Sequence, residues 1–135
     1  MLRACAFFDG MPDEAIRELT PHVEPRTLEP GAYLFHAGEP ADAVFVVASG
    51  SLEVVRLRPP EEMVVNVIGP RGAVGELAIL RGELRSASVR AKGRTLVFAI
   101  EGHAFLSWIH KWPEVAVAVA RATARGRELS NAIQD

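Results

Sequence analysis

The sequence has little of what marks a disulfide scaffold, a membrane span or a nucleic-acid surface. Cys5 is the single cysteine among 135 residues, so an internal disulfide is excluded. Asp9, Asp13 and Glu14 interrupt the N-terminal region, and no run of about 18 uncharged apolar residues occurs, which argues against a signal peptide and a membrane helix. With 15 basic and 17 acidic side chains, the formal net charge is −2. We therefore expect a cytoplasmic protein with no direct nucleic-acid binding and no membrane insertion.

The sequence also lacks the patterns of common catalytic and metal centres. The four histidines are dispersed, with no His-x-His pair and no carboxylate at ligand spacing, so a metal site of the kind found in enzymatic β-barrels is not expected. No serine lies in a Gly-x-Ser-x-Gly elbow, which sets acyl transfer aside. These absences predict a chain that is not an enzyme and carries no metal or cofactor.

Hydrophobic periodicity predicts a mainly β fold with flanking helices, over a single domain that spans residues 1–135. Pro12 stands at the expected first position of a short N-terminal helix that carries Ala15, Ile16 and Leu19. Short β-rich runs separated by glycine or proline follow, which is typical of an antiparallel β-roll or jelly roll (a double-stranded β-helix). The runs are Tyr33–Phe35, Val44–Ala48, Leu52–Leu57, Met63–Ile68, Ser86–Ala91 and Leu96–Ile100.

After Ile100 the pattern becomes helical again and predicts two C-terminal helices. The first contains Phe105 and Trp108, and Trp112-Pro113 ends it while placing proline at the start of the second. Both tryptophans are expected to pack in the core. The last helix is predicted from about Pro113 to Asn131, with one apolar stripe at heptad spacing: Val115, Val119, Ala122, Gly126, Leu129 and Ile133.

The most informative segment is Gly75-Glu76-Leu77-Ala78-Ile79-Leu80, which is followed after four residues by Arg85-Ser86-Ala87-Ser88-Val89. Gly-Glu is expected to open a short helix whose N-terminal N–H groups suit a phosphate, and Arg85 adds a planar, permanently charged donor fork. A carboxylate would repel that phosphate, so Glu76 is expected to point at another group, such as a sugar hydroxyl. Phosphate and ribose together indicate a nucleotide. An ordinary surface ion pair is the alternative, but the apolar residues between the two charges favour burial of the segment.

This cassette resembles the phosphate-binding cassette of the cyclic nucleotide-binding domain family, including bacterial cAMP-receptor-type regulators. Three further segments resemble family signatures in the same order along the chain: Phe35-His36-Ala37-Gly38-Glu39-Pro40, Phe45-Val46-Val47-Ala48-Ser49-Gly50-Ser51-Leu52, and Gly69-Pro70-Arg71-Gly72. The resemblance covers roughly residues 7–129.

The resemblance implies a role for each cassette residue. Arg85 should clamp the exocyclic phosphate oxygens, with Ser86 donating to the same group, and Glu76 should accept from the ribose 2′-OH. The backbone of Gly75, Leu77 and Ala78 should line the pocket. The remaining implied ligand-binding residues are Ala87 in the cassette, Val64 and Val74 against the sugar or base, and Thr123 and Arg125 from the last helix as base contacts.

The resemblance also implies a function, with alternatives that the residues leave open. The leading interpretation is a regulatory module that senses cAMP, or possibly cGMP, and whose C-terminal helices transmit ligand occupancy to a partner or effector. The runner-up is a ligand-free scaffold domain that keeps the fold, or a sensor that prefers cGMP. The apolar stripe fits an amphipathic helix lying on the roll, or the seam of a homodimer as in cAMP-receptor-type regulators. The effector is expected outside this sequence, which is either a fragment of a longer regulator or a stand-alone sensor.

Overall fold

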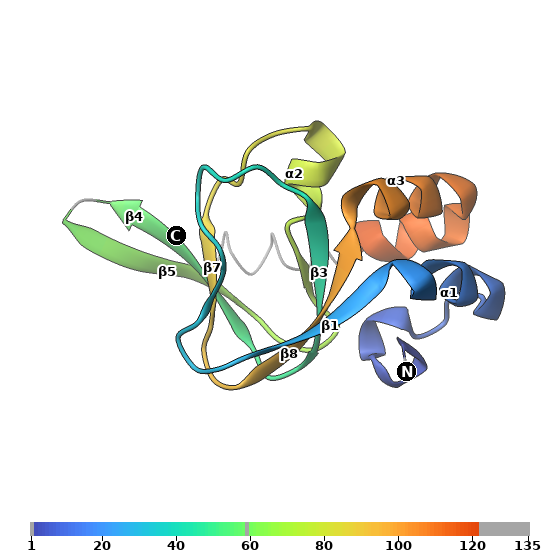
Figure 1. The fold of residues 1–135 in the computed structure, drawn as a ribbon, viewed down its shortest axis with the longest axis horizontal. Coiled ribbons are helices and arrows are strands. Elements are labelled where there is room, and N and C mark those ends of the chain that lie inside the picture. The colour runs from blue at the N-terminus through green and yellow to red at the C-terminus, as the bar shows by residue number, and fades with distance from the viewer. Residues whose placement is uncertain (1, 59, 122–135) are drawn as a thin grey trace.

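The computed structural model describes residues 2–58 and 60–121 and consists of two antiparallel four-stranded sheets with helices on one side (Figure 1). One sheet has the order β1-β8-β3-β6 and the other β2-β7-β4-β5, which confirms the expected β-roll. The strands are β1 (Val23–Leu28), β2 (Tyr33–Phe35), β3 (Ala43–Ser49), β4 (Leu52–Arg58), β5 (Glu61–Ile68), β6 (Ala73–Val74), β7 (Ser88–Ala91) and β8 (Thr95–Glu101).

Helices precede, interrupt and follow the strands. They are α1 (Asp13–Leu19), α2 (Glu76–Arg81) and α3 (Gly102–Lys111), with 3₁₀ turns at Leu2–Ala4, Ala6–Phe8 and Thr20–His22. A further helix begins at Pro113 and covers residues 113–121, so the N-terminal helix and both C-terminal helices are confirmed. Figure 1 shows α1 and α3 packed together beside the roll, whereas α2 lies near one end of it. None of the helices in residues 2–58 and 60–121 is long and apolar enough to cross a membrane.

Strand β3 separates two hydrophobic cores because its side chains alternate between the faces of the first sheet. Phe45 and Val47 point into the roll and pack with residues of the second sheet. Val44 and Val46 point to the other face and pack against the helices. In that second core the indole Nε1 of Trp108 donates a 2.8 Å hydrogen bond to the carbonyl of Ala15, which joins α3 to α1. The core position expected for Trp108 is therefore confirmed.

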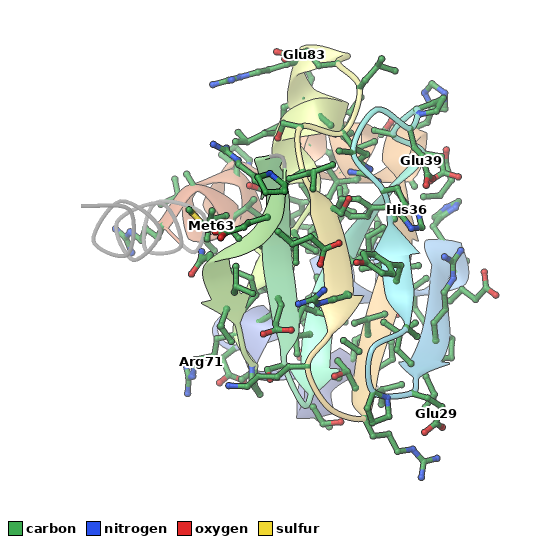
Figure 2. All side chains as sticks on the ribbon, turned by 90° about the vertical axis from the view of Figure 1, so that its left-hand side faces the viewer. Glu29, His36, Glu39, Met63, Arg71 and Glu83 are labelled. Atoms are coloured by element: carbon green, nitrogen blue, oxygen red, sulfur yellow. The ribbon has the colours of Figure 1, made fainter. Side chains whose placement is uncertain are left out.

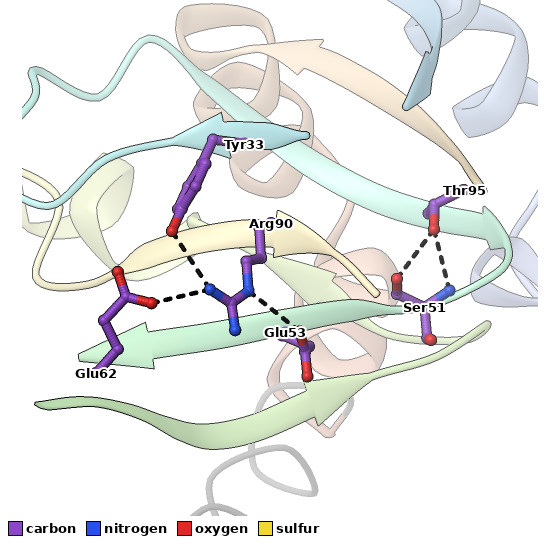
Figure 3. A network of polar contacts seen from close by, with 6 residues as sticks. All are labelled: Tyr33, Ser51, Glu53, Glu62, Arg90 and Thr95. Atoms are coloured by element: carbon purple, nitrogen blue, oxygen red, sulfur yellow. Dashed lines mark hydrogen bonds and ion pairs between the residues drawn. The ribbon is translucent and has the colours of Figure 1, made fainter. Parts of the chain in front are cut away.

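Arg90 ties together the outer face of the second sheet. Its Nε lies 3.1 Å from Glu53 on β4, and its Nη1 lies 3.0 Å from Glu62 on β5 and 3.4 Å from the Tyr33 hydroxyl on β2 (Figure 3). The hydrogen bonds that Arg90 donates to the Tyr33 hydroxyl and to the Glu53 carboxylate raise the pKa of Arg90. This arginine thus has two carboxylate partners, Glu53 and Glu62.

Three local expectations differ from the structure. Strand β1 was not among the expected runs; it is an edge strand whose burial pattern shows four exposed residues in a row, so it lacks the alternation that reveals a strand. Strand β6 has only two residues, too few for a periodic signal. Pro12 lies at the N-cap of α1, with ψ of 140°, and not at the first helical position.

The strand expected from Ser86 begins only at Ser88. Ser86 and Ala87 form a bend, because the preceding main chain at Arg85 is hydrogen-bonded to the loop after β2 and not to a neighbouring strand. In β4, a register shift between Val54 and Val55 interrupts the regular pairing with β5.

The first two positions of the C-terminal apolar stripe pack on the chain's own core. Val115 and Val119 are buried in the cluster formed by α1, α3 and the N-terminal turns. In these turns the helix is therefore amphipathic and lies on the roll, as the first of the two interpretations predicted. The other stripe positions, Ala122, Gly126, Leu129 and Ile133, lie outside the described residues, as do Thr123 and Arg125.

Candidate functional site

The cassette is built around two glycines that bracket α2. Gly75 follows β6 and caps the N-terminus of α2 with φ of 86°, and Gly82 ends the helix with φ of 65°. Both values lie in the left-handed region that glycine adopts without a steric penalty. A Cβ at position 75 would overlap Nη1 of Arg85 and lie 3.2 Å from its Cζ, whereas a Cβ at position 82 would meet nothing within 4 Å. Gly75 therefore serves both the turn and the close approach of Arg85.

Arg85 is a buried cation held by neutral groups. Only 4% of the residue is exposed. Nη1 donates to the carbonyl of Gly75 at 2.9 Å, and Nη2 donates to the carbonyl of Ala43 at 2.7 Å. Nε is buried with no hydrogen-bond partner. A guanidinium has five N–H donors, so these bonds leave donor capacity on the side chain.

The surroundings of Arg85 are aromatic on one face and acidic at longer range. Its Cζ lies 4.1 Å from the centre of the Phe35 ring, close enough for a cation–π contact. Burial lowers the pKa of Arg85, and the negative charges of Asp42, Glu39 and Glu76 act in the opposite direction. No carboxylate forms an ion pair with Arg85 among residues 2–58 and 60–121. The site therefore keeps a cation buried without a direct counter-ion, which is costly unless another anion compensates it.

The loop after β2 fixes the main chain of Arg85. The N–H of Gly38 donates to the carbonyl of Arg85 at 2.8 Å, and the N–H of Arg85 donates to the carbonyl of Glu39 at 2.9 Å. Figure 2 shows His36 and Glu39 together on this loop, where His36 Nδ1 lies 2.9 Å from the Glu39 carboxylate. Residues of the Phe-x-x-Gly-Glu signature thus contact the cassette directly.

Some of the expected site residues lie close together in the structure, and others do not. Gly75 and Arg85 are in contact, and Glu76, only 8% exposed as the first residue of α2, is near enough to act on the charge of Arg85. Val74 and Ala87 are buried, Leu77 and Ala78 are half-buried, and Ser86 is exposed. Val64 lies on β5 opposite Val55, and no interaction between Val64 and the cassette is found among the described residues.

Sequence reasoning missed two partners of Arg85, namely Phe35 and Ala43. Phe35 carried a signal, since it opens a family signature, but its ring was not assigned to the site. Ala43 contributes a main-chain carbonyl, a group that every residue has, so no side-chain pattern could identify it. Within the described part of the chain, no group of three or more His, Cys, Asp or Glu side chains is arranged to hold a metal ion.

Comparison with known proteins identifies the family. The sequence profile of the cyclic nucleotide-binding domain matches residues 25–111, which include the loop after β2, the cassette and α3. The chain therefore belongs to the cyclic nucleotide-binding domain family and is a regulatory sensor module of that class.

The relatives are larger proteins of different kinds. The chain is 34% identical over 124 residues to an uncharacterized NTE family protein of Mycobacterium tuberculosis, covering 92% of the chain and 21% of that protein. It is 28% identical over 132 residues to the CRP-like cAMP-activated global transcriptional regulator of the same species, covering 97% and 59%. The structure of a cAMP-binding acyltransferase from Mycobacterium smegmatis superposes with a TM-score of 0.78 at 28% identity, covering 89% of the chain and 37% of that protein.

Proposed function

We propose that this domain binds a cyclic purine mononucleotide, with cAMP preferred over cGMP, and acts as a non-catalytic sensor. The observation that carries the proposal is Arg85, a buried guanidinium with an unpartnered Nε and no direct carboxylate partner among the described residues. An anion bound there would compensate the buried charge. Two relatives support the choice of ligand: the regulator of M. tuberculosis is named as cAMP-activated, and the acyltransferase of M. smegmatis as cAMP-binding.

The proposed roles follow the chemistry of each group. Arg85 binds the exocyclic phosphate through its remaining donors, and Ser86, which is exposed beside it, donates to the same phosphate. Glu76 accepts from the ribose 2′-OH. The pocket is completed by the backbone of Gly75, Leu77 and Ala78, and by the side chains of Val64, Val74 and Ala87.

Ligand binding is proposed to require a shift of the cassette. Because Arg85 is only 4% exposed, a phosphate can reach its guanidinium only if the surrounding cassette segment moves. Such a movement would couple ligand binding to the conformation of the rest of the domain. A ligand that binds one conformation better than another shifts the population toward that conformation. This coupling supports a regulatory role that acts on an effector domain or partner.

Dimerisation through the C-terminal helix belongs to the same proposal. Val115 and Val119 pack on the roll, while Val117 on the opposite side of that helix is 50% exposed. The heptad spacing of the stripe in the sequence supports a shared seam at its later positions, which lie outside the described residues. Sedimentation velocity with and without cAMP tests this part, with a dimer mass as the expected result. The free Cys5, buried in the core, and a nucleotide ligand both fit a cytoplasmic module.

Calorimetric titration with cAMP and cGMP tests the proposed ligand. Binding at 100 times the dissociation constant should stabilise the fold by about 2.7 kcal/mol, which a thermal melt detects. Arg85→Ala should weaken binding by about 2–5 kcal/mol, because the phosphate loses its charged partner. Arg56→Ala is the matched control, since Arg56 is an exposed arginine on β4. If neither nucleotide gave binding heat or a thermal shift, the sensor proposal would be wrong and the ligand-free scaffold interpretation would take its place.

A further inference from the structure

The ring of Phe35 forms a flat surface against which the guanidinium of Arg85 lies. Phe35 ends β2 and is 9% exposed, and its ring centre is 4.1 Å from the Arg85 Cζ. A second ring, that of Phe45, lies 5.8 Å from the same atom. The two rings belong to one hydrophobic cluster, and their centres are 5.9 Å apart. Both distances fall within the range of a cation–π contact, and Phe35 is much the nearer of the two rings.

Phe35 and two carbonyls together define the position of the guanidinium. The carbonyls of Gly75 and Ala43 receive the two Nη groups, which fixes the direction in which the planar group points. The ring of Phe35 limits its displacement perpendicular to that plane. The Nε–H is the donor that none of these contacts uses. The three contacts thus hold the fork in one orientation while leaving donor capacity for an anion.

The segment that carries Phe35 also holds the main chain of Arg85. Gly38 and Glu39, three and four residues after Phe35, make the two backbone hydrogen bonds to Arg85. Ala37, which directly precedes Gly38, donates its N–H to the Ser88 hydroxyl at 3.0 Å, just beyond the bend. Residues 35–39 therefore contact both the side chain and the main chain of Arg85.

We propose that Phe35 is a positioning residue for anion binding: its ring face holds the Arg85 guanidinium in the orientation in which the phosphate of the nucleotide meets it. This inference rests on the proposed function for its ligand. The interaction with Phe35 is electrostatic as well as steric, because the negative face of an aromatic ring attracts the cation. The identity of the ring at position 35, beyond its volume, is thereby expected to affect affinity.

The first test compares Phe35→Leu with Phe45→Leu by calorimetric titration with cAMP. Both variants remove one buried ring from the same cluster, so both lose stability in a thermal melt. Phe35→Leu should weaken binding about 10- to 30-fold, the effect of a desolvated cation–π contact, and Phe45→Leu much less. Phe35→Tyr keeps the ring and should restore affinity to within about threefold of the wild type. Equal losses of affinity in the two leucine variants would overturn the proposal.

The second test keeps the shape of the ring and changes only its electrostatics. Replacing Phe35 by phenylalanines with one, two and three ring fluorines should lower affinity for cAMP in steps, because fluorine withdraws charge from the ring face. The same series at position 45 should change affinity much less, because that ring lies farther from the Arg85 Cζ. This test remains decisive if Phe35→Leu fails to fold. A flat response at position 35 would show that the ring acts by packing alone and would refute the positioning role.

A ligand-free measurement separates this inference from the proposed function. In an NMR spectrum of the ligand-free protein, the ring current of Phe35 should shift the Nε–H resonance of Arg85. Phe35→Leu should abolish that shift, whereas Phe45→Leu should retain most of it. If the wild type binds neither nucleotide but the resonance responds in this way, the ligand assignment fails and the contact with Phe35 stands. If the wild type binds cAMP and the resonance is the same in both leucine variants, the positioning role fails and the ligand assignment stands.

Discussion

Gly75→Ala, compared with a control variant, distinguishes an effect on nucleotide affinity from an effect on folding stability. The new Cβ would overlap Nη1 of Arg85 and would also lie on a residue with φ of +86°, where a side chain is strained. The strain costs about 1–2 kcal/mol of folding free energy. To restore van der Waals contact, Nη1 must retreat by about 1 Å, which breaks its bond to the Gly75 carbonyl.

The loss of affinity follows from that displacement. A hydrogen bond to a charged group contributes about 1.5–3 kcal/mol, so the misplaced guanidinium should bind cAMP about 10- to 150-fold more weakly. Gly82→Ala is the matched control, because Gly82 also has a positive φ at an end of α2 but has open space around the Cβ position. It should lower the melting temperature by a similar amount and leave affinity unchanged. Calorimetry on both variants decides the point: the same affinity for Gly75→Ala and Gly82→Ala would refute the reasoning.

Two further predictions concern Glu76 and Glu101, which have different roles. Glu76→Gln should weaken cAMP binding less than Arg85→Ala and should reduce the preference for cAMP over its 2′-deoxy analogue, which titration of both ligands measures; an undiminished preference would remove Glu76 from the ribose. Glu101 caps α3 by accepting from the N–H groups of Ala104 and His103 at 2.8 and 3.0 Å, and these bonds lower its pKa from the ordinary 4.5. The capping carboxylate therefore stabilises the fold above that pH and loses this effect as the pH falls through the lowered value. Glu101→Gln should be less stable than the wild type at pH 7, with a gap that closes on acidification in urea melts; a gap independent of pH would contradict the capping role.

The elements that sequence could reveal are those whose side chains alternate or whose residues have special chemistry. The continuous apolar run of β3 indicated a buried strand, and Trp112-Pro113 marked the break between the C-terminal helices. Strand β1 could not be predicted from the sequence, because its four central residues are all exposed and show no alternation of buried and exposed positions. Its place in the sheet depends on pairing with β8, a contact far along the chain.

The candidate site shows the same division. Gly75, Glu76 and Arg85 were identified because a flexible backbone position, a carboxylate and a guanidinium have few roles in an apolar segment. The orientation of Arg85 could not be predicted, since it depends on the carbonyl of Ala43, 42 residues away, and on the ring of Phe35. Sequence therefore revealed which groups carry charge, and tertiary packing decided what each group contacts.

The route from the site to α3 is short and passes through two consecutive carbonyls. The carbonyl of Ala43 accepts from Arg85, and that of Asp42 accepts from the N–H of Gly102, the first residue of α3, at 2.9 Å. Gly102 is also closely packed, because a Cβ there would lie 3.0 Å from Cδ1 of Ile79 on α2 and 3.2 Å from the carbonyl of Asp42. A ligand that binds Arg85 or shifts α2 thus acts on groups in direct contact with the start of α3. Because packed interfaces of this kind change between discrete arrangements rather than deform gradually, a small displacement at Arg85 is expected to reposition α3 as a unit.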